Sequence, residues 1–176
     1  MEVRLPKIND ENEIISYIEE HYANNENVLS ASNGLTSTKY ETWVEKIHNN
    51  VIIGDEVWGK SYTYLVFNNN KLVGMLSIRY DLSEELVNQY GHIGYGVRPS
   101  ERRKGYATKM LKYALEECKK LGLNTVVLGC YKENIGSVKT IVKNGGKLAR
   151  EVDDIQNIED NYTINLINQF YVIENI

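Results

Sequence analysis

The sequence predicts a mixed α/β (α+β) fold: a mostly antiparallel sheet with a central parallel strand–helix–strand unit and helices on both faces. Three observations predict it. A short strand and two helices open the chain, β-rich runs at 62–67 and 72–80 form an antiparallel hairpin, and strands at 92–98 and 125–131 flank a long amphipathic helix. Because strands joined by a crossover helix usually pair in parallel, we expect 92–98 and 125–131 to do so.

The first third of the chain is expected to hold one strand, at residues 3–8, and two helices separated by an Asn-, Ser- and Gly-rich loop at 23–35. The segments 10–13 and 38–41 both have the spacing of a capping box, which marks a helix start. Apolar residues then recur at helical spacing. The two stripes are Ile14, Ile15, Ile18 and Tyr22 in the first helix and Tyr40, Trp43, Val44 and Ile47 in the second.

The remaining elements follow from turn signals and periodicity. Asn- and Lys-containing residues 68–71 turn the hairpin, and 83–89 form a short helix. The clearest helix spans 104–121, and another is expected at 134–144, before strands at 147–152 and 162–173. The stripe of the long helix consists of Ala107, Met110, Leu111, Ala114, Leu115, Cys118 and Leu121.

Composition favours one domain, residues 1–176, located in the cytoplasm. The chain is 42% hydrophobic, which suffices for a core, and its net charge of −4 argues against a nucleic-acid partner. Two cysteines, Cys118 and Cys130, lack a metal-ligand spacing and are expected to be reduced thiols, so no metal is predicted. The N-terminal residues lack the apolar core of a signal peptide, and no apolar run approaches membrane-spanning length.

A basic triplet directly precedes the long helix. The first turn of a helix leaves backbone N–H groups free and carries partial positive charge, so cations there are unfavourable unless an anion lies between them. A glycine and small residues would let an anion approach the backbone. The alternative is a solvated basic turn. The residues concerned are Arg102, Arg103, Lys104, Gly105, Ala107 and Thr108.

Three stretches resemble the GNAT superfamily of acetyl-CoA-dependent N-acetyltransferases, most closely a group of bacterial predicted acetyltransferases. They are HIGYGVRP at 92–99, RRKGYA at 102–107, which resembles the pyrophosphate motif (Arg/Gln)-x-x-Gly-x-(Gly/Ala), and NIGSVKTIVKNGG at 134–146. Their order and spacing match that family over about a third of the chain. The resemblance implies a GNAT-like fold, acetyl-CoA as cosubstrate and N-acetyltransferase activity.

The resemblance also implies how acetyl-CoA is held. Backbone N–H groups from Arg103 through Thr108 would bind the pyrophosphate, and the strand ending at Val97 would pair with the pantetheine arm between strands that splay apart. Asn134 would bond a pantetheine amide. The implied cofactor-binding residues are Tyr95, Gly96, Val97, Arg102, Arg103, Lys104, Gly105, Tyr106, Ala107, Thr108, Asn134 and Ser137.

The implied chemistry is direct attack of an amine on the thioester, with the Val97 N–H stabilising the oxyanion. His92 is the candidate base, because many relatives carry Glu there; the alternative is a strand histidine satisfied by the backbone. The acid of the family, a Tyr seven residues after the Asn, is replaced by Ile141. Tyr131, Ser137 or solvent are the substitutes.

The acceptor is expected to be a primary amine of a small molecule or a protein. Acidic residues would suit a polyamine, an aminoglycoside or a basic peptide, or are simply solvated. We expect acetyl-CoA and the acceptor as partners, neither nucleic acid nor membrane, and leave a homodimer open. A non-catalytic acyl-CoA sensor is the alternative function. The acidic residues are Asp81, Glu84, Glu85, Asp153, Asp154, Glu159 and Asp160.

Overall fold

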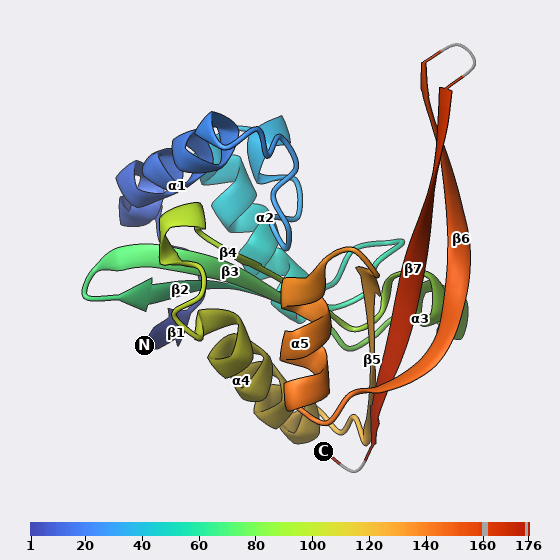
Figure 1. The fold of residues 1–176 in the computed structure, drawn as a ribbon. Coiled ribbons are helices and arrows are strands. Elements are labelled where there is room, and N and C mark those ends of the chain that lie inside the picture. Colours follow the sequence, from blue (N-terminus) through green and yellow to red (C-terminus); the bar gives the residue numbers. More distant parts are fainter. Residues whose placement is uncertain (160–161, 175) are drawn as a thin grey trace.

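The strands form two antiparallel sheets that meet near the middle of the molecule (Figure 1). The computed structural model describes the backbone of residues 1–159, 162–174 and 176, and the side chains of 1–156, 164–174 and 176. The first sheet has the order β1 (Glu2–Arg4), β2 (Ser61–Asn68), β3 (Lys71–Arg79) and β4 (Ile93–Val97). The second has the order β5 (Thr125–Tyr131), β7 (Tyr162–Glu174) and β6 (Lys147–Glu159).

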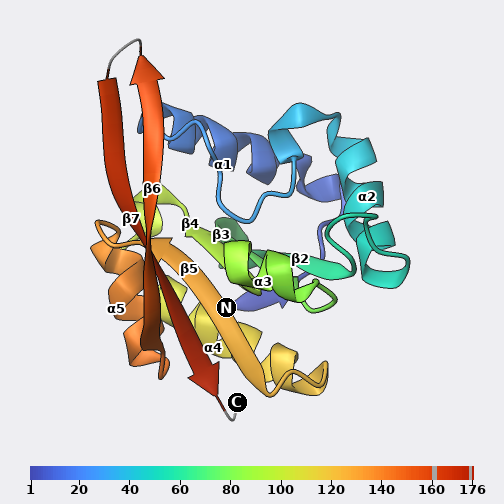
Figure 2. The same cartoon turned by 90° about the vertical axis from the view of Figure 1, so that its right-hand side faces the viewer.

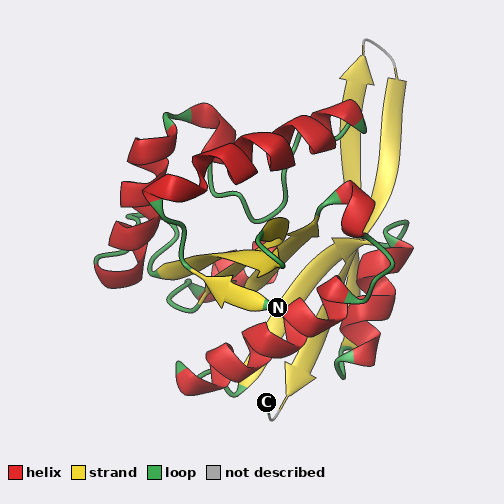
Figure 3. Ribbon diagram, turned by 90° about the vertical axis from the view of Figure 1, so that its left-hand side faces the viewer, coloured by secondary structure: helices red, strands yellow, loops and turns green. Residues whose placement is uncertain are grey.

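Helices cover both faces of the first sheet, as predicted (Figure 3). One face is covered by α1 and α2, and the other by α4, with α5 packed against α4 and β5. The short helix α3 joins β3 to β4, and 3-10 turns lie at Ile8–Asp10, Leu35–Ser37 and Pro99–Glu101. The α-helices are α1 (Glu11–Ala23), α2 (Tyr40–Ile52), α3 (Glu84–Tyr90), α4 (Tyr106–Lys120) and α5 (Ile135–Lys143).

Each face of the first sheet has its own hydrophobic core. Alternate residues of β2 enter opposite cores: Tyr64 and Val66 join the α4 side, whereas Leu65 and Phe67 join the α1–α2 side. The apolar stripe of α4 is confirmed at its centre, where four residues are fully buried. They are Met110, Leu111, Ala114 and Cys118.

The hairpin and the short helix are confirmed together with their local signals. Asn69 and Asn70 of the β2–β3 turn have φ of 50° and 63°, the left-handed conformation that asparagine tolerates best after glycine. Ser83 caps α3 by accepting a hydrogen bond of 3.3 Å from the Leu86 N–H.

The predicted helix starts near residues 10 and 40 are correct, but both capping boxes are wrong. The Asp10 carboxylate accepts two bonds of 2.6 Å from the Arg4 guanidinium and one of 2.7 Å from the Lys7 N–H, so it does not cap α1. α2 begins after Lys39 without a side-chain cap. Because Arg4 offers Asp10 a charge-assisted pair, the tertiary contact replaces the local one.

The predicted stripe of α1 is shifted, whereas that of α2 holds. Ile15 and Tyr22 are 45% and 44% exposed, while Tyr17 is fully buried and His21 nearly so. In α2, Trp43, Val44 and Ile47 are buried as expected. The apolar residues of α1 are compatible with burial of either of two helix faces. Packing against β3 buries the face that contains Tyr17.

The expected parallel pairing of 92–98 with 125–131 is not found among the described strands. β4 belongs to the first sheet and β5 to the second. Just before β4, an isolated antiparallel bridge joins Gly91 to Leu128, and the His92 backbone N–H donates to the Val127 carbonyl at 2.7 Å. The two strands were expected to pair and to splay apart at one end, but they lie in different sheets. β5 is instead hydrogen-bonded to β7 along its whole length.

The predicted strand at 147–152 continues as β6 to Glu159. With β7 it forms a long hairpin that projects beyond the rest of the molecule (Figure 2). Of the acidic residues predicted in this segment, Asp160 lies outside the described residues, as does the side chain of Glu159. None of the described helices is long and apolar enough to cross a membrane.

Candidate active site

The N-terminus of α4 presents a run of unpaired backbone donors. None of the six amides from Arg103 through Thr108 has a hydrogen-bond acceptor among the described residues, and the first paired amide is that of Lys109, which donates to the Gly105 carbonyl at 3.2 Å. Gly105 is the N-cap residue with φ of 82°, and a Cβ added to it would meet no atom within 4 Å. The arrangement is an open cradle of N–H groups at the positive end of a helix.

Two side chains of the basic triplet are paired with carboxylates of the chain itself. Arg102 donates two bonds of 2.6 Å to the Glu26 carboxylate, and Lys104 pairs with Glu101 at 2.9 Å. Glu26 holds the pKa of Arg102 above its ordinary value, and Arg102 lowers the pKa of Glu26. Arg103, in left-handed conformation with φ of 61°, has no recorded side-chain bond among the described residues.

The separation of β4 from β5 leaves a cavity of about 290 Å³ between these two strands and the start of α5. Arg98 N–H donates to the Val73 carbonyl at 2.9 Å, and hydrogen-bonded pairs alternate along an antiparallel ladder. The backbone polar groups of Tyr95 and Val97 therefore point away from β3 and toward the gap. The cavity is lined by Ser30, Tyr95, Cys130, Tyr131, Asn134 and Ser137, among others.

Asn134, Ser137 and Tyr95 are brought together at the edge of this cavity. Asn134 caps α5 through its Oδ1, which accepts the Ser137 N–H at 3.1 Å. The Ser137 hydroxyl lies 2.8 Å from the Tyr95 hydroxyl. Burial raises the pKa of Tyr95 to about 12, so this phenol stays protonated at neutral pH. Three predicted residues, from β4 and the start of α5, thus form one hydrogen-bonded group.

Ile141, which stands where the family's acid is expected, is a core residue. Its side chain is 1% exposed, and a Cβ on Gly146 would lie only 2.3 Å from its Cγ2. Tyr131, a predicted substitute, is 38% exposed and donates its hydroxyl to Asp154 at 2.7 Å. This bond raises the pKa of Tyr131. Of the two predicted substitutes, Ser137 is the one whose hydroxyl is engaged inside the cavity group.

His92 lies at the start of β4 and is buried. The ring Nδ1 of His92 accepts the Val127 N–H at 3.0 Å. The backbone N–H of His92 donates to the Val127 carbonyl at 2.7 Å. Burial lowers the pKa of His92, and the nearby Arg79 guanidinium lowers it further. The ring is thus held neutral with Nδ1 unprotonated. The backbone contact that was the alternative interpretation of His92 is present. In this neutral tautomer Nε2 carries the ring proton, so the lone pair that could accept a proton is the one on Nδ1.

The predicted acidic residues do not converge on the cavity. Asp154 bonds Tyr131 and Gln156, and Asp153 accepts from Asn165 at 3.2 Å. Asp81, Glu84 and Glu85 are exposed. These contacts favour the interpretation of solvated surface charges. Among the described residues, no group of three or more His, Cys, Asp or Glu side chains is arranged to hold a metal ion.

Three residues near the site had no signal in the sequence. Glu26 comes from the Asn-rich loop and reaches Arg102 across 76 positions. The Tyr17 hydroxyl is buried without a hydrogen-bond partner among the described residues and lies 3.4 Å from where a Cβ on Gly96 would be. Arg79 ends β3 beside His92. Each becomes a site residue only through long-range packing.

These features define the class of protein: one that binds a phosphorylated cofactor between two separating strands and at a helix N-terminus. Residues 28–145 match the model of the acetyltransferase (GNAT) family, and the chain belongs to this family. It is therefore an acetyl-CoA-dependent N-acetyltransferase by class. No curated protein matched the chain.

Solved structures with the same fold cover nearly the whole chain. One is yncA, a putative acetyltransferase from Salmonella typhimurium with its cofactor acetyl-CoA: 14% identity, TM-score 0.66, covering 99% of this chain and 94% of that one. An N-acetyltransferase from Staphylococcus aureus Mu50 has 19% identity and a TM-score of 0.63, covering 99% and 98%. RimL, a ribosomal L7/L12 alpha-N-protein acetyltransferase in complex with coenzyme A, has 18% identity and a TM-score of 0.67, covering 98% and 92%.

Proposed function

We propose that the protein transfers the acetyl group of acetyl-CoA to a primary amine, of a small molecule or a protein, by direct attack in a ternary complex. The observation that carries the proposal is the cradle of six amides from Arg103 through Thr108, which have no acceptor among the described residues, together with the cavity between β4 and β5. The cradle suits a pyrophosphate and the gap suits a pantetheine arm. Both parts are needed to present a thioester.

In this proposal the phosphates lie on the amides at the start of α4, including that of Tyr106, and the small residues Gly105 and Ala107 allow close approach. The side chains of the triplet 102–104 add positive charge, for which Arg102 exchanges Glu26 for phosphate. The pantetheine amides pair with Tyr95 and with the Asn134 side chain, whose Nδ2 has no acceptor among the described residues. Gly96 keeps the strand flat against the arm.

The reaction forms a C–N bond and breaks the C–S bond of the thioester. The amine attacks the carbonyl carbon, and the Val97 N–H, which points into the gap, stabilises the oxyanion. In this proposal His92 accepts the amine proton, directly or through one water, at Nδ1, which must give up its bond from the Val127 N–H because Nε2 carries the proton of the neutral ring. The thiolate takes its proton from Ser137, which Tyr95 supports, or from Tyr131 or solvent.

The test is an acceptor screen that follows free thiol release from acetyl-CoA, with the acetylated amine identified by mass. We expect release that depends on both the amine and the protein. The non-catalytic sensor is the second candidate, favoured by the burial of Ile141 where the acid is expected. Saturable acetyl-CoA binding without thiol release for any amine would support the sensor. The homodimer stays a prediction.

A further inference from the structure

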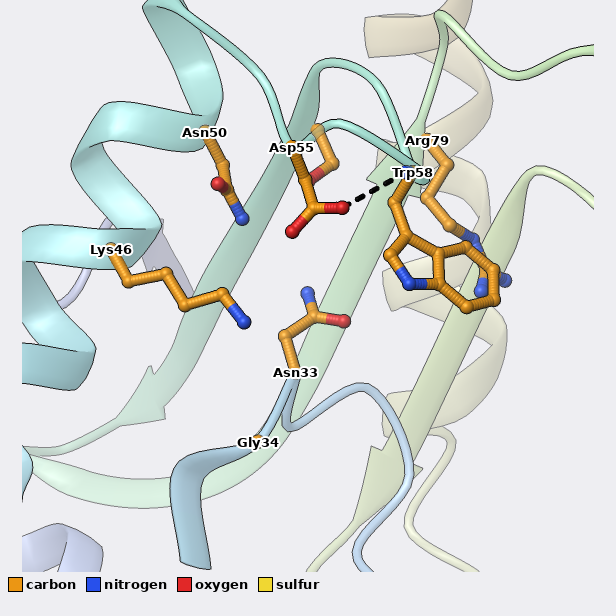
Figure 4. A pocket seen from close by; sticks show the side chains of 8 residues that line it. Asn33, Gly34, Lys46, Asn50, Asp55, Trp58 and Arg79 are labelled. Carbon is orange, nitrogen blue, oxygen red and sulfur yellow. Dashed lines mark hydrogen bonds between the residues drawn. The ribbon is translucent and has the colours of Figure 1, made fainter. Parts of the chain in front are cut away.

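A second cavity, of about 300 Å³, opens on the α2 side of the first sheet (Figure 4). It lies between α2, the loop that joins α2 to β2, and the end of β3. Its volume is at the lower end of small-molecule pockets. The lining residues are mostly polar, and they are Asn33, Gly34, Lys46, Asn50, Asp55, Trp58, Ser61 and Arg79.

Arg79 is an incompletely paired cation in the wall of this cavity. Among the described residues, its Nε is buried without a hydrogen-bond partner, and the side-chain bond recorded for it runs from Nη2 to the Tyr90 carbonyl at 3.2 Å. No described carboxylate lies within ion-pair distance of it. A guanidinium has five N–H donors, and burying one without an anion is costly. Burial accordingly lowers the pKa of Arg79.

The other charges of the lining leave an excess of positive charge. Lys46 projects from α2 into the cavity, and no ion pair is recorded for it among the described side chains (Figure 4). Asp55, the carboxylate in the lining, is engaged by the N–H groups of Val57 and Trp58 at 2.9 and 3.1 Å. Two cations therefore face one carboxylate, in a chain whose net charge is −4. This local sign favours an anionic ligand.

This second cavity lies next to the first one, the gap between β4 and β5, in which the thioester is proposed to lie. Arg79 Nη2 is 3.9 Å from where a Cβ on Gly94 would be, and Gly94 lines the gap. Trp58 of the cavity and Tyr90 of the gap stack edge to face, with ring centroids 4.9 Å apart. The Arg79 guanidinium therefore lies close to Gly94 on β4, at the side where the two cavities approach each other.

We propose that the acceptor is an amine that also carries a carboxylate, and that Arg79 and Lys46 hold this carboxylate while the amine reaches the thioester. The inference rests on the proposed function. A guanidinium fork matches the two oxygens of a carboxylate. Gly94 marks the carboxylate end, near Arg79, and Val97 marks the thioester end. Three residues of a strand span about 10 Å, so the amine and the carboxylate of the acceptor are separated by several bonds.

The test compares amino carboxylates, from glycine to 6-aminohexanoate, with their primary amides, which have the same amine but no anion. Thiol release from acetyl-CoA gives kcat/KM for each pair. We expect the longer carboxylates to exceed their amides by about 10- to 100-fold, the range of a lost charge-assisted contact. Equal values for acid and amide, with turnover of both, would overturn the inference and leave the proposed function intact.

Two variants assign the preference to the cavity. Arg79→Met and Lys46→Met should each reduce the acid-to-amide ratio, and Lys112→Met, the same change on the exposed face of α4, should leave it unchanged. No described carboxylate pairs with Arg79, so its removal leaves no buried carboxylate unpaired. Arg79→Met is therefore expected to fold with unchanged or higher stability. An unchanged ratio in both cavity variants would refute the assignment.

A binding measurement separates failure of this inference from failure of the proposed function. N-acetyl-6-aminohexanoate is titrated calorimetrically into the wild type and into Arg79→Met, in the presence of coenzyme A. Binding that Arg79→Met abolishes, in a protein that releases no thiol, would keep the carboxylate site and refute the acetyl transfer. Absence of both binding and turnover would refute both.

Discussion

At the scale of single residues, Gly105 combines a left-handed backbone with an open side. Its φ is 82°, and no atom lies within 4 Å of an added Cβ. The fold therefore does not exclude a side chain here by collision. A phosphate on the α4 amides would do so, which makes this position diagnostic for the cofactor.

Gly105→Val is expected to abolish the stabilisation that acetyl-CoA gives. A ligand at 100 times its Kd stabilises the folded state by about 2.7 kcal/mol, which appears as a rise in Tm. Gly122→Val is the matched control, because Gly122 has φ of 85° and open space but lies at the other end of α4. Both variants should lose basal stability through backbone strain. Equal acetyl-CoA shifts in the two variants would remove the loop from the site.

His92 allows a pH test of the base. Because burial lowers its pKa, kcat/KM should rise with pH through a value below about 6.5. His92→Ala is expected to lower kcat by about 100-fold and to remove this limb, with acetyl-CoA affinity unchanged. His92→Glu should recover part of the rate.

His48→Ala is the matched control, since His48 bonds the Pro6 carbonyl at 2.9 Å on α2, away from the gap. The acceptor must be the same throughout, because its own ammonium titrates too. A His92→Ala enzyme with wild-type kcat and an unchanged limb would make His92 structural. The amine would then lose its proton to water before binding.

At the scale of elements, the α1–α2 segment contacts the cofactor loop through Glu26 and Arg102. The two side chains are 32% and 44% exposed, so their pair contributes little to stability, between about 0 and 1 kcal/mol. The pair nevertheless engages the Arg102 guanidinium, which is proposed to bind a phosphate of the cofactor. Phosphate binding at Arg102 must compete with this pair.

Glu26→Gln is expected to tighten acetyl-CoA binding by about two- to fivefold, because the neutral amide competes less with phosphate for Arg102. The dissociation constant is measured by calorimetry at fixed ionic strength. Glu117→Gln removes a comparable pair, with Lys120 at the far end of α4, and should have no effect. Weaker binding in Glu26→Gln would instead mean that Glu26 positions Arg102 for the phosphate.

At the scale of the whole molecule, carboxylates paired with basic residues join distant segments. Arg98, which is buried, donates to Glu20 at 2.5 Å, and Glu101 joins Lys71 to Lys104. Burial alone would raise the pKa of Glu20, but Arg98 and the Ser100 N–H lower it to about 2. Pairing with Lys104 and Lys71 lowers the pKa of Glu101 as well.

Stability should therefore fall as the solution is acidified. A carboxylate with a depressed pKa binds its proton more weakly in the folded state, so its contribution is full above about pH 4.5 and is lost as pH falls toward 2. Urea unfolding midpoints measured from pH 7 to pH 3 should decline. Glu20→Gln should flatten this decline, and Glu45→Gln, an exposed change on α2, should not. Parallel profiles for the two variants would contradict this role of Glu20.

Local patterns sufficed for most elements. The hairpin turn at Asn69–Asn70 and the apolar stripe of α4 were predictable because turn geometry and helical periodicity depend on neighbours in the sequence. The same holds for the cofactor loop, since a glycine before a helix start is a local feature. The capping box at 10–13 failed because Arg4, brought near by the fold, binds Asp10 more strongly than a helix amide does.

By itself, the sequence determined most of the elements, the glycine-containing helix start proposed to bind phosphate and the family resemblance, all of which depend on residues close together in the chain. Only the tertiary structure decided that β4 and β5 lie in separate sheets, that Glu26 neutralises Arg102, and that Arg79 faces a cavity without a carboxylate partner. These contacts join residues far apart in the chain. Their energies depend on burial and on which charges packing brings together, which no local pattern encodes.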